Sequence, residues 1–272
     1  MESLRFRLKT AFFCATLLSL PLLGCAALSN RPSEERVKMS KSETSLAADL
    51  WQRQGLTREA LDHVLRAVEY DKENPDAAHL AALIYLDFCR TSEIGECRLG
   101  EAEKHARRAI AERKDFLEAQ NTLAVVLIHQ KRHEEAIRIL LPLTENMLYA
   151  TPEIAWGNLG WAHLEKGDMK QAIPALRRAI AAQPLFCVGS YRLGVAYSRS
   201  GAMESAVEAL DRAVSTAAPG CGALQEAYFE RAQAHFALGR AENVRADLDR
   251  CLDLSKATST GRECSRMMAS LD

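Results

Sequence analysis

A pattern of residue types that recurs about every 34 positions limits the folds open to this chain more than any other feature. It is clearest from Glu153 to Phe186, where large, small and turn-forming residues occupy fixed places. These places hold Trp156, Leu159, Gly160, Gly167, Ala172, Leu176, Ala179 and Pro184. A fixed period of this length indicates a stack of similar units, each of which buries its apolar face against the next.

The residue types in this unit have a physical reason. Two antiparallel helices approach closely only where small residues lie at their crossing, here Gly160, Ala172 and Ala179. Gly167 suits the turn between the helices because glycine tolerates a positive φ, and Pro184 ends the second helix. The unit resembles the tetratricopeptide repeat, a helix–turn–helix motif. The sequence therefore predicts an all-α, right-handed superhelix of tetratricopeptide repeats.

Other units share this register, so we predict six repeats followed by a short C-terminal capping helix over 259–272. Two units are irregular. In the second, the second helix comes late, which indicates an insertion between the two helices, and in the sixth, Arg231 stands where an apolar residue is expected. The expected boundaries are about 41–74, 75–116, 117–152, 153–186, 187–224 and 225–258.

The residues before the repeats resemble an export signal. Basic residues precede an apolar stretch over 10–24, which is too short to be trusted as a membrane-spanning helix. The stretch ends in Leu22–Ala26, which resembles the bacterial lipobox. We therefore expect a signal peptide over 1–24 and a lipid on Cys25; an ordinary signal peptide cleaved elsewhere is the alternative. Ala26, where an inner-membrane retention signal has Asp, favours the outer membrane.

Residues 26–44 are polar with almost no apolar content, so we predict that 25–44 forms a lipidated, flexible tether. Loss of 1–24 would change the formal net charge from −1 to −3, because three basic residues and one acidic residue leave. A nearly balanced charge provides no field for nucleic acid, so no nucleic-acid partner is expected.

The chain has 8 cysteines, of which Cys14 would leave with the signal and Cys25 would carry the lipid. The rest would lie in a compartment that permits disulfides. Cys89 and Cys97 flank the insertion in the second unit and are the best-supported pair.

Two further pairs are favoured with less support, Cys187 with Cys221 and Cys251 with Cys264. Cys251 could instead be a free buried thiol, because its place in the repeat calls for a small residue. Metal binding is the other alternative. It is disfavoured because no CxxC pair occurs and no histidine lies beside a cysteine at ligand spacing.

Catalytic patterns are missing from the sequence. His129 and His133 are four apart at the turn of the third unit, where we expect them to be solvated rather than to bind a metal. We find no acid–base pair, no nucleophile in a recognisable context and no glycine-rich phosphate loop. We therefore expect no enzyme activity, no cofactor, no metal and no small-molecule substrate.

Tetratricopeptide arrays generally bind partners on the concave face, through fixed positions of each first helix. The two central positions are polar in the first unit, Asp49 and Gln52, but apolar in the second to fourth units. We therefore predict a groove for an apolar or amphipathic protein segment. Its apolar members are Leu83, Leu86, Val125, Ile128, Trp161 and Leu164, and its polar border is Asn121, Tyr191 and Arg192.

The alternative is that the superhelix winds tightly enough to bury these apolar side chains between neighbouring units. If they face the groove, charged residues in place of Trp161 and Ile128 should abolish partner binding without unfolding the chain.

Nearly the whole chain resembles the type IV pilus pilotins, outer-membrane lipoproteins of six tetratricopeptide repeats, and among them the social-motility lipoproteins of myxobacteria. The resemblance rests on the lipobox, the number of units and three segments, NTLAVVLIHQKRHEEAI, PEIAWGNLGWAHLEKGD and QPLFCVGSYRLGVAY. It implies that the protein binds secretin subunits in the periplasm and promotes their insertion or multimerisation in the outer membrane, for pilus biogenesis and pilus-dependent motility.

The alternatives are a scaffold for peptidoglycan enzymes or for outer-membrane barrel assembly, and an accessory subunit of a periplasmic hydrolase. The repeats alone do not separate these functions.

Overall fold

The computed structural model describes residues 32–91 and 97–271, and these residues form helices and no strand. A short 3-10 helix, η1 (Cys221–Ala223), precedes the sixth pair of α-helices. The α-helices are α1 (Glu34–Gln52), α2 (Thr57–Tyr70), α3 (Pro75–Thr91), α4 (Leu99–Glu112), α5 (Leu117–His129), α6 (His133–Glu145), α7 (Pro152–Lys166), α8 (Met169–Ala182), α9 (Cys187–Arg199), α10 (Met203–Ser215), α11 (Gln225–Ala237), α12 (Ala241–Leu254) and α13 (Ser259–Ala269).

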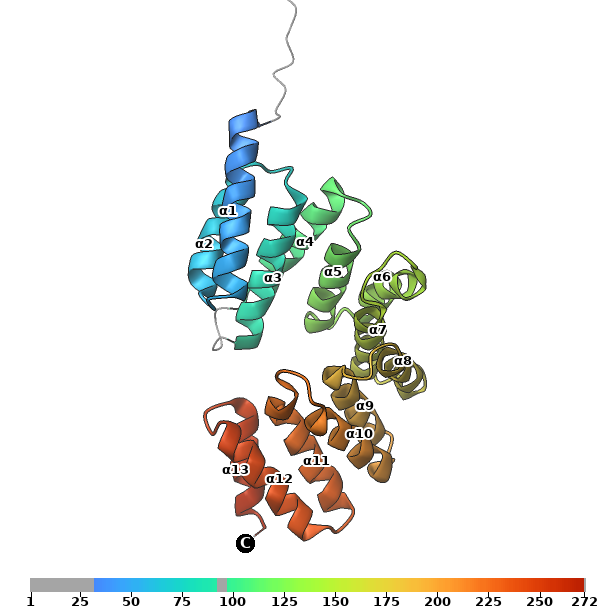
Figure 1. Ribbon diagram of the computed structural model, residues 1–272. Coiled ribbons are helices and arrows are strands. Elements are labelled where there is room, and N and C mark those ends of the chain that lie inside the picture. The colour runs from blue at the N-terminus through green and yellow to red at the C-terminus, as the bar shows by residue number, and fades with distance from the viewer. Residues whose placement is uncertain (1–31, 92–96, 272) are drawn as a thin grey trace, which may run out of the picture.

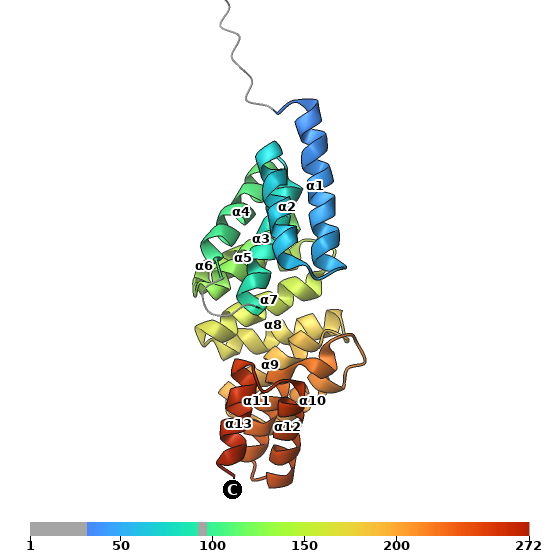
Figure 2. The same cartoon turned by 90° about the vertical axis from the view of Figure 1, so that its left-hand side faces the viewer.

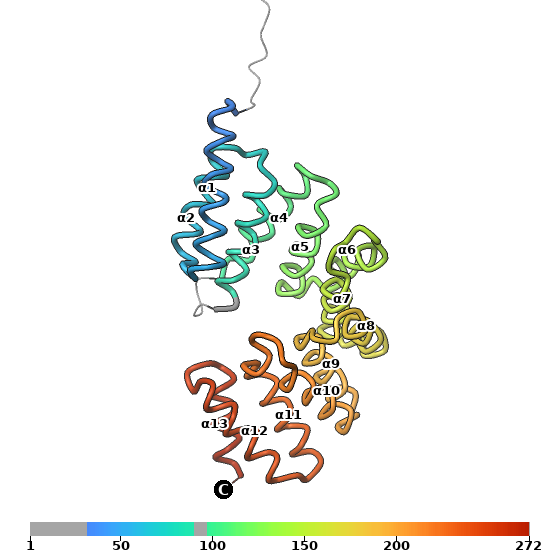
Figure 3. Tube along the Cα trace, in the orientation of Figure 1, coloured from blue at the N-terminus to red at the C-terminus, as the bar shows by residue number. Residues whose placement is uncertain are grey.

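Consecutive helices pack as pairs, from α1 with α2 to α11 with α12. The first helix of each pair also contacts the first helix of the next pair, so these helices form one continuous row. The array curves like the letter C, with α6 and α8 on its outer side and α1 and α13 towards its ends (Figure 1). Figure 2 views the array from the open side of the C, and Figure 3 traces the same path along the Cα atoms. The predicted all-α superhelix is confirmed.

Small residues allow the two helices of a pair to approach closely. A Cβ atom added to Gly160 on α7 would lie 2.5 Å from Cγ of Leu176 on α8. Gly167 takes a left-handed conformation, φ 86°, where α7 ends and the chain turns towards α8. Lys131 takes the same kind of conformation, φ 62°, between α5 and α6. The turn geometry is therefore kept even where glycine is missing.

The first helix begins earlier than expected. Residues 34–44, which we predicted to be part of a flexible tether, belong to α1. Ser33 caps this helix by accepting a hydrogen bond from the backbone N–H of Arg36. The predicted signal peptide 1–24, the lipid site Cys25 and the start of the predicted tether lie outside the described residues.

Polar contacts, rather than apolar burial, hold the first turns of α1. The Arg36 guanidinium donates to the backbone oxygens of Glu69 and Tyr70 at the end of α2, at 2.6 and 3.0 Å. The buried hydroxyl of Ser40 donates to the Ala67 oxygen at 2.8 Å and accepts from the Asn74 amide at 2.9 Å. The polar composition of this segment therefore led us to predict a tether, although side-chain hydrogen bonds fix it as a helix against α2.

Three disulfides lock parts of the array. One joins α3 to the residues just before α4, across the insertion in the second pair. The second joins the start of α9 to η1, and the third joins α12 to α13. The bonded residues, with their Cα–Cα distances, are the pairs that the sequence favoured: Cys89–Cys97 at 4.2 Å, Cys187–Cys221 at 5.8 Å and Cys251–Cys264 at 6.5 Å.

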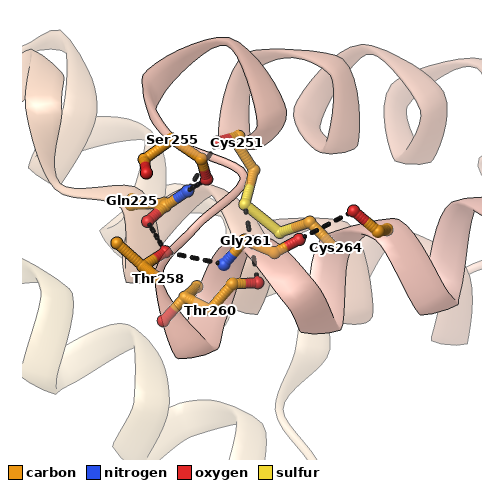
Figure 4. Close-up of a disulfide and its surroundings, with 8 residues drawn as sticks. Gln225, Cys251, Ser255, Thr258, Thr260, Gly261 and Cys264 are labelled. Atoms are coloured by element: carbon orange, nitrogen blue, oxygen red, sulfur yellow. Dashed lines mark hydrogen bonds between the residues drawn. A yellow bond between two sulfur atoms is a disulfide. The ribbon is translucent and has the colours of Figure 1, made fainter. Parts of the chain in front are cut away.

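The last disulfide is part of a polar junction that fixes α13 to the final pair (Figure 4). The buried Gln225 amide donates to the backbone oxygens of Cys251 and Ser255, at 2.7 and 2.5 Å. Its oxygen accepts from the Thr258 hydroxyl at 2.5 Å, and that hydroxyl in turn accepts from the Gly261 N–H at 2.9 Å. The amide of Gln225 thus connects the start of α11 to the turn that leads into α13.

Arg231, the residue that broke the apolar pattern of the sixth unit, forms a partly buried ion pair. Its guanidinium binds both carboxylate oxygens of Asp247 on α12 and also contacts Asp211 on α10 at 2.5 Å. Asp247 is only 4% exposed. Burial lowers the pKa of Arg231, but the two carboxylates outweigh it, so the net shift is upward. The charge therefore links the last two pairs of helices.

We expect Arg231→Met to lower the free energy of unfolding by about 3–5 kcal/mol, because it leaves the buried Asp247 carboxylate without its arginine partner. Urea denaturation followed by circular dichroism measures the change. Arg231→Met/Asp247→Leu should recover most of the loss, and Arg250→Met, at an exposed place on α12, should change little. A small effect of Arg231→Met would show that the pair does not stabilise the array.

Gly160→Val should lower the free energy of unfolding by about 1–3 kcal/mol, because the added side chain meets Leu176. Gly100→Val on α4 is the matched control, because a Cβ atom at Gly100 has no neighbour within 4 Å. Thermal unfolding of the two variants makes the comparison. Equal losses would mean that helix propensity, and not the close crossing, explains the result.

Candidate protein-binding groove

The inner row of first helices carries the predicted groove residues, and most of them reach its surface. Two of the predicted residues do not. Ile128 and Leu164 are each only 2% exposed, so the prediction that they present apolar surface to a partner is wrong, although Ile128 borders a cavity beside Trp161. The partly exposed members are Leu83 and Leu86 on α3, Asn121 and Val125 on α5, Trp161 on α7, and Tyr191 and Arg192 on α9.

The next pair of helices explains this burial. Ile128 belongs to a core cluster with Leu159 and Ala162 of α7, and Leu164 belongs to one with Leu193 and Ala196 of α9. Each side chain is thus covered by the first helix that follows. A charged residue at Ile128 would disrupt the core, so that substitution cannot test partner binding without unfolding the chain.

Phe236 on α11 is a groove candidate that sequence reasoning missed. It holds the place in its repeat that Leu86 holds in α3, and it is 60% exposed. Among the described residues, only the short helix α13 follows the pair α11–α12, so no further pair covers this position. The signal was present in the sequence, because the same repeat position can be read in every unit.

A ladder of polar side chains crosses the groove from α5 to α9. The Asn158 amide on α7 donates to the Asn121 side-chain oxygen at 3.0 Å. Nη1 of Arg192 donates to the Asn158 side-chain oxygen at 3.0 Å and to the Gly157 backbone oxygen at 3.2 Å. The sequence suggested Asn121 and Arg192 but not Asn158, which is 5% exposed and connects the two.

Aromatic rings flank the ladder. Cζ of Arg192 lies 4.4 Å from the centroid of the Trp161 ring, and the His129 ring meets Trp161 edge-on with centroids 5.1 Å apart. Desolvation lowers the pKa of His129, and the Arg192 charge lowers it further. Burial raises the pKa of Tyr191 to about 12. At neutral pH both groups are uncharged, so Arg192 carries the charge between them.

The groove is hollowed beside Trp161. A cavity of about 400 Å³ lies there. Its walls combine one aromatic ring and an apolar side chain with charged and polar groups: Ile128, His129, Lys131, His133, Trp161 and Glu165. A second cavity of about 260 Å³ is bordered by α8, α9 and α10 and contains Arg177, Tyr197, Glu208 and Arg212. The cavity at Trp161 therefore offers the groove a pocket for one side chain of a partner.

Among the described residues, the two most exposed large apolar side chains lie outside the groove. Met147 and Leu148, in the connection between α6 and α7, are 99% and 86% exposed. Leu141 on α6 is 50% exposed. Each of these side chains is an alternative apolar contact site outside the groove, so control variants at these places are informative.

His129 and His133 both line the cavity at Trp161. Across residues 32–91 and 97–271, no three His, Cys, Asp or Glu side chains are placed to hold a metal ion together. In the same part of the chain, no helix combines the length and the apolar character needed to cross a membrane.

Solved structures similar to this one cover most of the chain. The crystal structure of PilW, a widely conserved type IV pilus biogenesis factor, matches 82% of this chain and 97% of its own, with 21% identity and a TM-score of 0.68. PilF of Pseudomonas aeruginosa matches 86% of this chain and 100% of its own, with 17% identity and a TM-score of 0.63. A tetratricopeptide repeat protein from Parabacteroides merdae matches 83% and 82%, with 15% identity and a TM-score of 0.65. At these identities the likeness shows the fold alone.

Sequence comparisons give the family. No curated protein sequence matches the chain. Models of the tetratricopeptide repeat match residues 94–147, 148–185, 158–220 and 225–258, which together make up more than half of the chain. The fold of this family is a scaffold for protein–protein interaction. The chain therefore belongs to the tetratricopeptide repeat proteins, with a fold similar to that of type IV pilus biogenesis factors.

Proposed function

We propose that this protein is a pilotin-like lipoprotein of the outer membrane, which binds secretin subunits and promotes their insertion and multimerisation during type IV pilus biogenesis. The observation that carries the proposal is the strip of partly exposed apolar side chains along the inner row, Leu83, Leu86, Val125 and Trp161. The likeness of the fold to PilW and PilF supports it. The role requires no catalysis, and none of these side chains supplies any.

The groove would shield an apolar secretin segment until the subunits associate. Full burial of a leucine or valine side chain contributes about 1.5–3 kcal/mol. A few such contacts, reduced by the entropy lost when the segment is ordered, give a complex that forms and dissociates readily. Reversible binding suits a factor that has to release each secretin subunit when the subunits multimerise.

The proposed lipid would keep the groove close to the membrane. Because α1 begins at Glu34, residues 25–33 remain between the lipid site and the superhelix. This length spans at most about 30 Å even when fully extended. Confinement at this distance raises the local concentration of captured subunits where their barrel has to form.

Leu83→Glu and Val125→Glu should abolish the heat-resistant, high-mass secretin band on a blot of unheated outer-membrane samples. Each places a charge in the proposed interface while the side chain remains in contact with solvent. A strain without the gene should lose the same band and regain it with the wild-type gene. Normal rings in the deletion strain would overturn the function and favour a scaffold for other envelope proteins.

Leu141→Glu is the matched control, because it makes the same change at an exposed leucine outside the inner row. It should leave the rings intact. Leu148→Glu tests the connection between α6 and α7 in the same way. If Leu148→Glu abolishes the rings and Leu83→Glu does not, the docking surface is that connection and not the groove.

Cys25→Ser should release the protein from the outer membrane into the soluble periplasmic fraction and reduce secretin rings, because the variant cannot be acylated. Cell fractionation and labelling with a radioactive fatty acid measure the two effects. A Cys25→Ser variant that stays labelled and membrane-bound would contradict lipid attachment at this residue.

A further inference from the structure

Arg192, on α9 of the inner row, is held firmly by its neighbours. Its Nη1 is fixed by the Gly157 and Asn158 oxygens of α7, and its Cζ lies over the Trp161 ring, 4.4 Å from the centroid. The Asn158 side chain is itself held by Asn121 of α5. The long side chain of Arg192 therefore has little freedom left to lose when a ligand binds.

The charge of Arg192 has no carboxylate partner among the described residues. Glu165 is the carboxylate that acts on it, but Glu165 pairs with Arg199 at 3.5 Å. Burial lowers the pKa of Arg192, yet an arginine stays charged at neutral pH. The groove thus contains a partly desolvated cation without a matching anion.

Two donors of Arg192, Nε and Nη2, have no acceptor within the described part of the chain. Neither nitrogen is a buried polar atom without a partner, so both nitrogens reach solvent. These two nitrogens lie on one edge of the guanidinium, and their N–H groups match the two oxygens of a carboxylate. The same edge of Arg132 binds Glu135 in this protein, at 2.6 and 2.7 Å.

Apolar groups lie on both sides of this edge along the array. Val125 and Trp161 precede Arg192, and Phe236 follows it on α11. A segment that passes through the groove would bring apolar residues before and after the one that meets Arg192. A chain end would occupy only one of the two sides.

We infer that Arg192 binds the side-chain carboxylate of an aspartate or glutamate in the partner segment, flanked on both sides by apolar residues. This inference rests on the proposed function, because it needs a protein segment in the groove. Trp161 and Asn158 act as positioning residues: the ring supports the guanidinium plane, and the amide fixes Nη1 so that Nε and Nη2 face the ligand.

The test uses the full chain and an array of overlapping peptides that cover the pilus secretin. The best-binding peptide that contains an acidic residue is then measured by fluorescence anisotropy, with and without replacement of that residue by its amide. Wild-type protein should lose about 10- to 100-fold in affinity for the amide peptide. Arg192→Gln should bind the two peptides equally, both as weakly as wild type binds the amide form.

Arg178→Gln is the matched control, because Arg178 also stacks on a tryptophan, Trp156, at 4.6 Å, but lies on the second helix α8. It should keep the preference for the acidic peptide. Arg192→Lys keeps the charge but loses the paired N–H donors of the guanidinium. Its preference for the acidic over the amide peptide should therefore fall between those of wild type and Arg192→Gln. If Arg192→Gln does not fold, the amide peptides on the wild-type protein still decide the question.

Three results would overturn the inference. Equal affinity of the wild type for acid and amide peptides would reject it and leave the groove, and the proposed function, intact. Loss of binding on amidation of the peptide's C-terminus, with no effect of the side-chain amide, would identify a chain end as the ligand instead. Failure of every secretin peptide to bind, together with normal rings in the deletion strain, would reject the inference and the function together.

Discussion

The close crossing of paired helices at small residues is the constraint on which the rest of the structure depends. A Cβ atom at Gly160 would meet Leu176, and one at Gly194 would meet Leu210, so neither crossing leaves room for a larger residue at these places. Tight pairs leave each unit with an apolar face that only the next unit can cover. Stacking therefore continues along the chain, and the stacked pairs follow the curve seen in Figure 1. The groove is a consequence of that curvature.

The period of the sequence predicted the helices because it reports a local requirement. The same small, large and turn-forming residues are needed in every pair, so one clear unit locates the others. The unit boundaries also favoured the disulfide between Cys187 and Cys221, because Cys187 begins the fifth unit and Cys221 lies in the connection that follows its second helix. A bond between them closes that unit onto itself.

What the sequence missed depends on how neighbouring units meet. Ile128 and Leu164 hold the same place in their repeats as Leu86, but the next first helix buries them. Ser40 and Arg36 read as tether residues because their partners are backbone oxygens of α2, which carry no sequence signal. Asn158 was missed for a similar reason, since its role appears only when α5 and α9 lie on either side of it. The repeat period alone therefore predicts where the helices lie better than it predicts which of their side chains are exposed.

Arg192 and Arg231 show two uses of an arginine in the same fold. Arg231 is partly buried between two carboxylates, so its charge is neutralised within the array and links the last two pairs of helices. Arg192 is held by neutral oxygens and a ring, so its charge faces the groove without a partner. An apolar groove alone discriminates poorly, because any apolar segment fills it. A partly desolvated cation adds a penalty for segments that lack an anion at that place, since such a segment would cover the Arg192 guanidinium without pairing it. Affinity would then come from the apolar strip and selectivity from Arg192.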